Sequence, residues 1–96
     1  SGYINLDKVF FCAGAPLPDE PVCVQDEKAQ YMLDKKFAEV FESEWLVNIE
    51  GKTSIKTLTR IPIKKVRVNG VGMAFDCAIE DIQVIGRVVL MITEGN

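Results

Sequence analysis

The sequence predicts an α+β fold, in which a mainly antiparallel curled sheet or small partly open barrel of about five to seven strands packs against one amphipathic helix. Three observations predict it. Apolar residues recur at steps of three and four between Asp26 and Glu42, the period becomes two after Glu44, and Asn69-Gly70 separates two strand-like segments.

Length and composition indicate one folded domain over residues 1–96. The chain has 96 residues, 48% of them hydrophobic and 26% charged, which is enough to bury a core without staples. The mean hydropathy of +0.12 is high for so short a chain, so apolar surface is expected to remain exposed and to favour self-association; scattered exposed aliphatic residues are the alternative. The start, Ser1-Gly2, resembles a remnant of tag cleavage and leaves a longer parent protein open.

The first quarter predicts short strands around a loop. The apolar run Val9–Cys12 within Lys8–Ala13 is compatible with a strand, and Val22–Val24 with another. Between them, Pro16, Pro18 and Pro21 exclude regular structure, so we expect a semi-rigid connector.

The helix is predicted from Asp26 to Glu42. Its apolar face would comprise Ala29, Met32, Leu33, Phe37, Val40 and Phe41. Asp26 would cap the first amides of this helix. An alternative breaks the segment at Asp34-Lys35 into a hairpin followed by a shorter helix.

The segment after Glu44 predicts a meander. Trp45, Val47 and Ile49 alternate with polar residues as in a half-buried strand, and Gly51-Lys52 is expected to turn the chain into a strand over 53–61. Pro62 belongs at an edge or a break, because proline cannot donate to a ladder.

Asn69-Gly70 predicts a two-residue type I′ turn between strands 63–68 and 71–80. In the second strand the predicted core face comprises Val71, Met73, Phe75, Cys77 and Ile79. The opposite face is small, with Gly72, Ala74 and Ala78, so a helix or another subunit could approach closely there, although a plain surface face is the alternative. The last segment, 82–92, is apolar on both faces and should be the central strand, covered on one side by the helix.

Residue types exclude most catalytic chemistry. Histidine is absent, which removes the commonest general base and metal ligand. Cys12, Cys23 and Cys77 are odd in number and dispersed, which indicates buried, reduced thiols and no zinc site. No phosphate-binding or calcium-binding motif occurs. Asp76, Glu80 and Asp81 could meet Glu44 or Glu50, but we interpret all of these as solvated surface acids. We therefore expect no enzyme, cofactor or metal.

Charge is segregated along the chain. Residues 1–50 hold four basic and ten acidic side chains, and residues 51–96 hold seven and four, so net charges of −6 and +3 give the total of −3. The stretch from 52 to 67 contains no acid and six basic residues, namely Lys52, Lys56, Arg60, Lys64, Lys65 and Arg67. These predict either a nucleic-acid-binding surface or a basic hairpin balanced by the acidic helix through Glu27, Asp34, Glu39, Glu42 and Glu44. A third interpretation is that they protect sheet edges from aggregation.

Our leading hypothesis is a non-enzymatic assembly module that forms a homo-oligomer, or docks on a protein partner, through a strand edge or apolar sheet face. The alternative is a nucleic-acid-binding module. The pI near 4.9 and the lack of aromatic residues between Lys52 and Arg67 weaken that alternative. No apolar run is long enough to span a membrane and no signal peptide is seen, so a cytoplasmic protein is expected.

Overall fold

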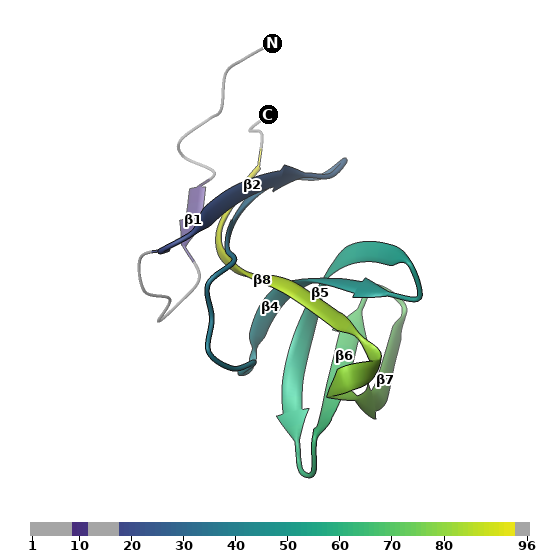
Figure 1. Ribbon diagram of the computed structural model, residues 1–96. Helices are drawn as coiled ribbons and strands as arrows, with labels where there is room; N and C mark the ends of the chain where they lie inside the picture. The colour runs from purple at the N-terminus through teal and green to yellow at the C-terminus, as the bar shows by residue number, and fades with distance from the viewer. Residues whose placement is uncertain (1–8, 12–17, 94–96) are drawn as a thin grey trace. The chain divides into compact units, whose positions relative to one another are not determined.

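The structure is a computed structural model that describes residues 9–11 and 18–93, and it is nearly all antiparallel sheet (Figure 1). The strands are β1 Val9–Phe11, β2 Pro21–Gln25, β3 Gln30–Asp34, β4 Ser43–Ile49, β5 Lys52–Ile61, β6 Lys65–Gly70, β7 Met73–Ala78 and β8 Gln83–Ile92. A short 3-10 turn, η2, covers Ile79–Asp81. The described ranges contain no α-helix, and hence no helix that could span a membrane.

The chain divides into two compact units. The hairpin unit comprises residues 1–36 and 88–96, and in its described part β2 pairs with β3, β3 neighbours β8, and β1 also pairs with β8. The meander unit comprises residues 37–87, with the strand order β8-β4-β5-β6-β7. Strand β8 contributes its first residues to the meander unit and its last residues to the hairpin unit.

The predicted helix over Asp26–Glu42 is wrong, and with it the α+β class. Asp26 does accept two amide hydrogens as a cap would, from Lys28 and Ala29, but it does so in the turn of the β2–β3 hairpin. Tyr31 and Leu33 are then buried on one face of β3. The apolar residues of this segment fit both a helical spacing and the two-residue spacing of a strand. Pairing with β2 stabilises the strand. The alternative with a hairpin before Asp34 was correct in its hairpin and wrong in its helix.

The predicted strand from Glu44 is confirmed and carries the core of the meander unit. Trp45 and Val47 in β4 are fully buried, as is Leu58 in β5. Val66 and Val68 of β6 complete the buried cluster together with Val40, and Cys77 and Ile79 pack against it. Alternation of inward and outward side chains along each strand therefore builds this unit.

The hairpin predicted around Asn69-Gly70 exists, but its turn lies two residues later. Gly70 pairs with Met73, so Val71 and Gly72 form the turn, and Gly72 has a φ of 87°. The shift of two residues keeps every side chain on the predicted face. The preceding turn is centred on Glu50 and Gly51, with φ angles of 53° and 83°, rather than on Gly51-Lys52. Pro62 lies in the turn between β5 and β6, as predicted.

The prediction that residues 82–92 form a central strand is confirmed. Strand β8 lies between β3 and β4 in the sheet order, and Val88 and Val89 are buried within the hairpin unit. Its predicted helical cover is absent, since the described residues contain no α-helix.

Candidate interaction surface

Strand β7 is the last strand in the order of the meander unit, and within the described residues it pairs with β6 alone. Ile79 continues this ladder by donating its N–H to the Lys64 carbonyl over 2.9 Å. In an antiparallel ladder alternate residues turn their backbone groups to opposite sides. The backbone groups of Ala74, Asp76 and Ala78 therefore face the open edge.

The same strand carries exposed apolar side chains. Met73 is 71% exposed and Phe75 is 38% exposed, and Val71 in the adjoining turn is 91% exposed. Register places Phe75 beside the buried Val68, so its face continues the core face. The prediction that this face lines the core is therefore right for Cys77 and Ile79, which pack on the core, and wrong for Val71, Met73 and Phe75, which are exposed. Exposed apolar residues beside an open strand edge are typical of an association surface.

The six basic residues predicted to bind nucleic acid are divided between two faces of the sheet. Lys56 and Arg60 in β5 share a face with buried Leu58, as does Lys52, whereas Lys65 and Arg67 in β6 lie on the opposite face. Lys64 lies in the turn before β6. The sheet therefore brings Lys52, Lys56 and Arg60 into one row and separates that row from the rest.

Two of these basic side chains have contacts within the unit. Arg67 donates to both carboxylate oxygens of Asp76, over 2.8 and 3.2 Å, and this pairing lowers the pKa of Asp76. Lys56 lies over Gly70, where an added Cβ would fall 2.5 Å from the lysine Nζ. The ion pair with Asp76 leaves less of the Arg67 charge available to a phosphate backbone, whereas the contact between Lys56 and Gly70 involves no acid.

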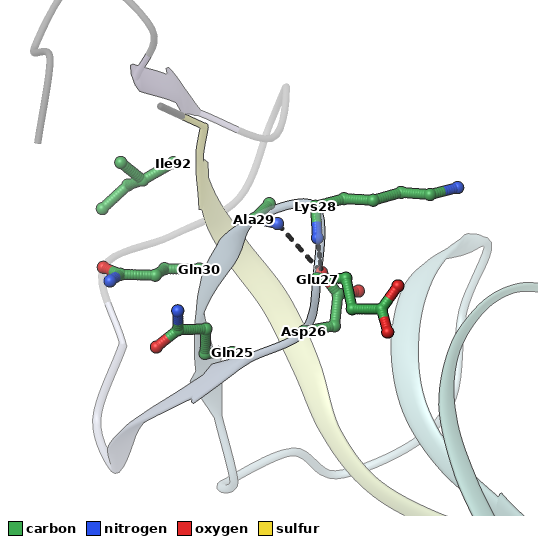
Figure 2. Close-up of a pocket in the computed structure, with 7 residues that line it drawn as sticks. All are labelled: Gln25, Asp26, Glu27, Lys28, Ala29, Gln30 and Ile92. Carbon is green, nitrogen blue, oxygen red and sulfur yellow. Dashed lines mark hydrogen bonds between the residues drawn. The ribbon is translucent and has the colours of Figure 1, made fainter. Parts of the chain in front are cut away.

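A hollow of about 220 Å³ lies at the turn of the β2–β3 hairpin (Figure 2). It is lined by Gln25, Asp26, Glu27, Lys28, Ala29, Gln30 and Ile92. The amides of Lys28 and Ala29 donate to Asp26 Oδ1 over 2.8 and 2.9 Å, and the Tyr31 hydroxyl donates to its other oxygen over 3.2 Å. These hydrogen bonds lower the pKa of Asp26, with the amide of Ala29 as the largest cause. The Asp26 carboxylate therefore stabilises the turn of the β2–β3 hairpin by accepting hydrogen bonds from its amides.

Asp34 is a buried acid in the hairpin unit, at the end of β3. Its carboxylate accepts the backbone N–H groups of Asp19, Glu20 and Lys36 at 3.1, 3.1 and 2.9 Å. The acidic helix that was predicted to carry Asp34 is absent from the described residues, where Asp34 lies in a strand. The side chain instead anchors the chain before β2 to the chain after β3.

An aromatic cluster lies beside β4 in the meander unit. The Trp45 ring meets Phe37 and Phe41 edge to face, with centroids 4.9 and 5.5 Å apart, and its Nε1–H donates to the Phe41 carbonyl over 2.9 Å. Arg87, only 4% exposed, places its guanidinium carbon 5.7 Å from the Phe41 ring centroid.

The described cysteines are free thiols. Cys77 is half-buried, and burial raises the pKa of its thiol. Cys23 is exposed on β2, so the prediction that it is buried is wrong. Cys12 lies outside the described residues.

Comparison with known proteins gives a consistent relationship. Residues 1–90 match the family model described as Bacteriophage CI repressor C-terminal domain. The chain is 39% identical over 93 residues to the Repressor protein CI of Escherichia phage 186, which covers 97% of this chain and 46% of that protein. It is 37% identical over 65 residues to Protein ORFi in retron Ec67 of Escherichia coli, covering 68% of this chain and 33% of that protein.

A further relative is the Repressor protein CI of Haemophilus phage HP1, 28% identical over 72 residues that cover 75% of this chain and 38% of the relative. The chain thus spans less than half the length of each of these three relatives. The chain belongs to the bacteriophage CI repressor C-terminal domain family.

Proposed function

We propose that this chain is an assembly domain that joins copies of a CI-type phage repressor into a homo-oligomer. Its family is regulatory and not enzymatic. The observation that carries the proposal is the open edge of β7, where Met73 and Phe75 are exposed next to unpaired backbone groups. Such an edge is stabilised when another strand covers it.

Association would matter for a repressor through effective concentration. The relatives are more than twice as long as the segment matched here, and we place their operator contacts in the remaining part. Joining two DNA-binding parts makes the second binding event intramolecular and can raise the overall affinity by about 10²- to 10⁴-fold. A small assembly domain would thereby affect the control of transcription.

Sedimentation equilibrium across a wide concentration range, at low and high salt, tests this function. We expect a discrete oligomer that persists at high salt, because apolar burial and backbone hydrogen bonds are screened far less than charges. A monomer at every concentration would refute it.

Binding of nucleic acid by Lys52, Lys56, Arg60, Lys64, Lys65 and Arg67 remains the second candidate. The row of Lys52, Lys56 and Arg60 on β5 favours it, while the position of Lys65 and Arg67 on the opposite face limits the phosphates that one duplex could contact.

The discriminating experiment compares two triple variants in the presence of single- and double-stranded nucleic acid. Lys56→Glu/Arg60→Glu/Lys65→Glu reverses three charges in the basic stretch, and Lys28→Glu/Lys35→Glu/Lys36→Glu reverses three exposed charges in the hairpin unit. Binding that falls steeply with salt and is lost only in the first variant would support this candidate. Equal behaviour of the two variants would argue against it.

A further inference from the structure

We infer that two copies of this chain pair through β7 in an antiparallel, two-fold arrangement in which Phe75 of one copy lies opposite Phe75 of the other. This inference rests on the proposed assembly function and names its surface and its register. It follows from the backbone, the side chains and the charges of one strand.

The backbone of β7 is ready to accept a further strand. Ala74 and Asp76 direct their N–H and C=O groups away from β6, as the Ile79–Lys64 hydrogen bond and the β6–β7 register require. The strand has no proline, lysine or bulge, which are the usual features that protect an edge. By contrast, β2 of the hairpin unit begins with Pro21, which cannot donate.

The side chains leave room for close approach on both faces. Ala74 and Ala78 are small and lie on the outer face with Asp76, while Met73 and Phe75 lie on the face that continues the core. A second β7 would therefore meet methyl groups on one face and apolar side chains on the other. The only charged side chain of the strand, Asp76, is paired with Arg67 of its own chain.

Charge and strand length select the register. A two-fold axis perpendicular to the sheet keeps each residue on its face, so Ala74, Phe75 or Asp76 could oppose its own copy. Opposing Asp76 to Asp76 places like charges directly across, which is destabilising. Placing Ala74 opposite Ala74 would require Gly72 to pair as a strand residue, but Gly72 lies in the turn with a φ of 87°.

The Phe75 register avoids both problems. Residues 73–77 of each copy pair along their whole length, Met73 faces Cys77 of the other copy, and Ala74 faces Asp76. Strand β7 ends at Ala78, where the 3-10 turn begins, so the paired length ends there as well. Because the backbone groups of Phe75 bond to β6, the two phenylalanines form a non-hydrogen-bonded pair, whose Cα atoms lie about 4.5 Å apart in an antiparallel ladder.

That short distance allows a cross-linking test of register. Under mild oxidation by dissolved oxygen with a copper–phenanthroline catalyst, Phe75→Cys, introduced with Cys12→Ser, Cys23→Ser and Cys77→Ser, should form a disulfide between copies, since Cα separations of about 4.4–6.8 Å permit one. Met73→Cys with only Cys77 of the native thiols retained should cross-link through that thiol, at mildly alkaline pH because burial raises the Cys77 pKa. Peptide mass spectrometry identifies each bond.

Val71→Cys in the cysteine-free background is the matched control. Val71 is the most exposed of these apolar residues but lies in the turn and outside the paired length. Cross-linking at Phe75→Cys that exceeds that at Val71→Cys by tenfold or more is the expected result. Equal yields, or a preference for Val71→Cys, would overturn the inferred register.

A backbone test separates this inference from the proposed function. Ala74→Pro removes an N–H that points to the open edge, so the β6 ladder is kept, and Ala74→Val is its control because it keeps that N–H. Losing two symmetry-related hydrogen bonds should raise the dissociation constant by roughly thirty-fold or more in the proline variant alone.

Each outcome has one meaning when thermal unfolding shows both variants folded. An oligomer that survives Ala74→Pro unchanged overturns the β7 pairing and leaves the assembly function standing. A wild-type chain that is monomeric throughout overturns both.

Discussion

Arg67 and Asp76 are register partners on β6 and β7, and their side chains form a two-bond ion pair, with Nε 2.8 Å from Oδ1. The guanidinium lowers the pKa of Asp76, chiefly through the hydrogen bond. Both side chains are exposed, so solvent and salt screen the pair, and its contribution to the free energy of unfolding is expected to be small.

Replacing Arg67 should therefore raise the Asp76 pKa. In Arg67→Gln we expect the carboxyl to titrate near the ordinary aspartate value, and to do so at all salt concentrations, whereas in the wild type added salt should also raise it. Carbon-detected NMR of the Asp76 carboxyl measures this. An unchanged titration in Arg67→Gln would show that the ion pair is absent in solution.

Asp34→Asn should be strongly destabilising. An amide offers one acceptor oxygen in place of a carboxylate that now accepts three backbone N–H groups, so at least one of these part-buried hydrogen bonds is lost. The expected loss is about 2–3 kcal/mol in chemical denaturation. Asp19→Asn is the control, because it makes the same chemical change at an exposed site, and equal effects of the two would contradict the anchoring role.

Asp26 makes the hairpin turn sensitive to acid. Hydrogen bonds from the amides of Ala29 and Lys28 lower the pKa of Asp26 in the folded state. The contribution of Asp26 to the free energy of unfolding is therefore complete above the ordinary aspartate pKa, and it is lost as the pH falls through the lower pKa of the folded state. Asp26→Ala should cost about 1 kcal/mol at neutral pH and remove this acid dependence, whereas Asp26→Asn should keep much of the turn. Urea denaturation between pH 2 and 6 gives both quantities; a pH profile identical in wild type and Asp26→Ala would exclude this role.

The position of the β6–β7 turn can be tested with two substitutions of Gly72. Gly72→Ala should destabilise by about 1 kcal/mol because its φ of 87° is unfavourable for a residue with a Cβ. Gly72→Asn should be milder, because asparagine tolerates positive φ. Had the turn been at Asn69-Gly70, Gly72 would lie in an extended strand and the order of the two substitutions would reverse, which thermal denaturation would reveal.

Phe41 stacks over the guanidinium of Arg87 and forms a T-shaped pair with Trp45, although Phe41 itself is 47% exposed. Phe41→Leu keeps an apolar side chain and removes both ring contacts, so we expect a loss of about 1 kcal/mol. Val71→Ala, at a more exposed apolar site, should have almost no effect. Fluorescence of the single tryptophan follows unfolding in each case, and similar midpoints for wild type and Phe41→Leu would contradict the cluster.

Strand identity in the second half of the chain followed from local pattern. The period of two at Trp45, Val47 and Ile49 predicted β4, and the two-sided apolar run at its end predicted that β8 is central. A glycine beside a polar residue located the β6–β7 hairpin within two residues of its true turn. Only Gly72, and not Gly70, adopts positive φ, and both dipeptides contain glycine, so sequence alone could not choose between them.

The sequence by itself determined that the chain has period-two strands, a basic stretch from 52 to 67 and no histidine, because these depend on residue type and spacing alone. Tertiary structure decided the rest. Ala29, Leu33 and Phe37 fit a helical face, and only the pairing of β3 with β2, together with the three amides held by Asp34, turned that segment into a strand. Long-range partners likewise left Met73 and Phe75 exposed at an edge, since burial depends on which strand, if any, lies beside them.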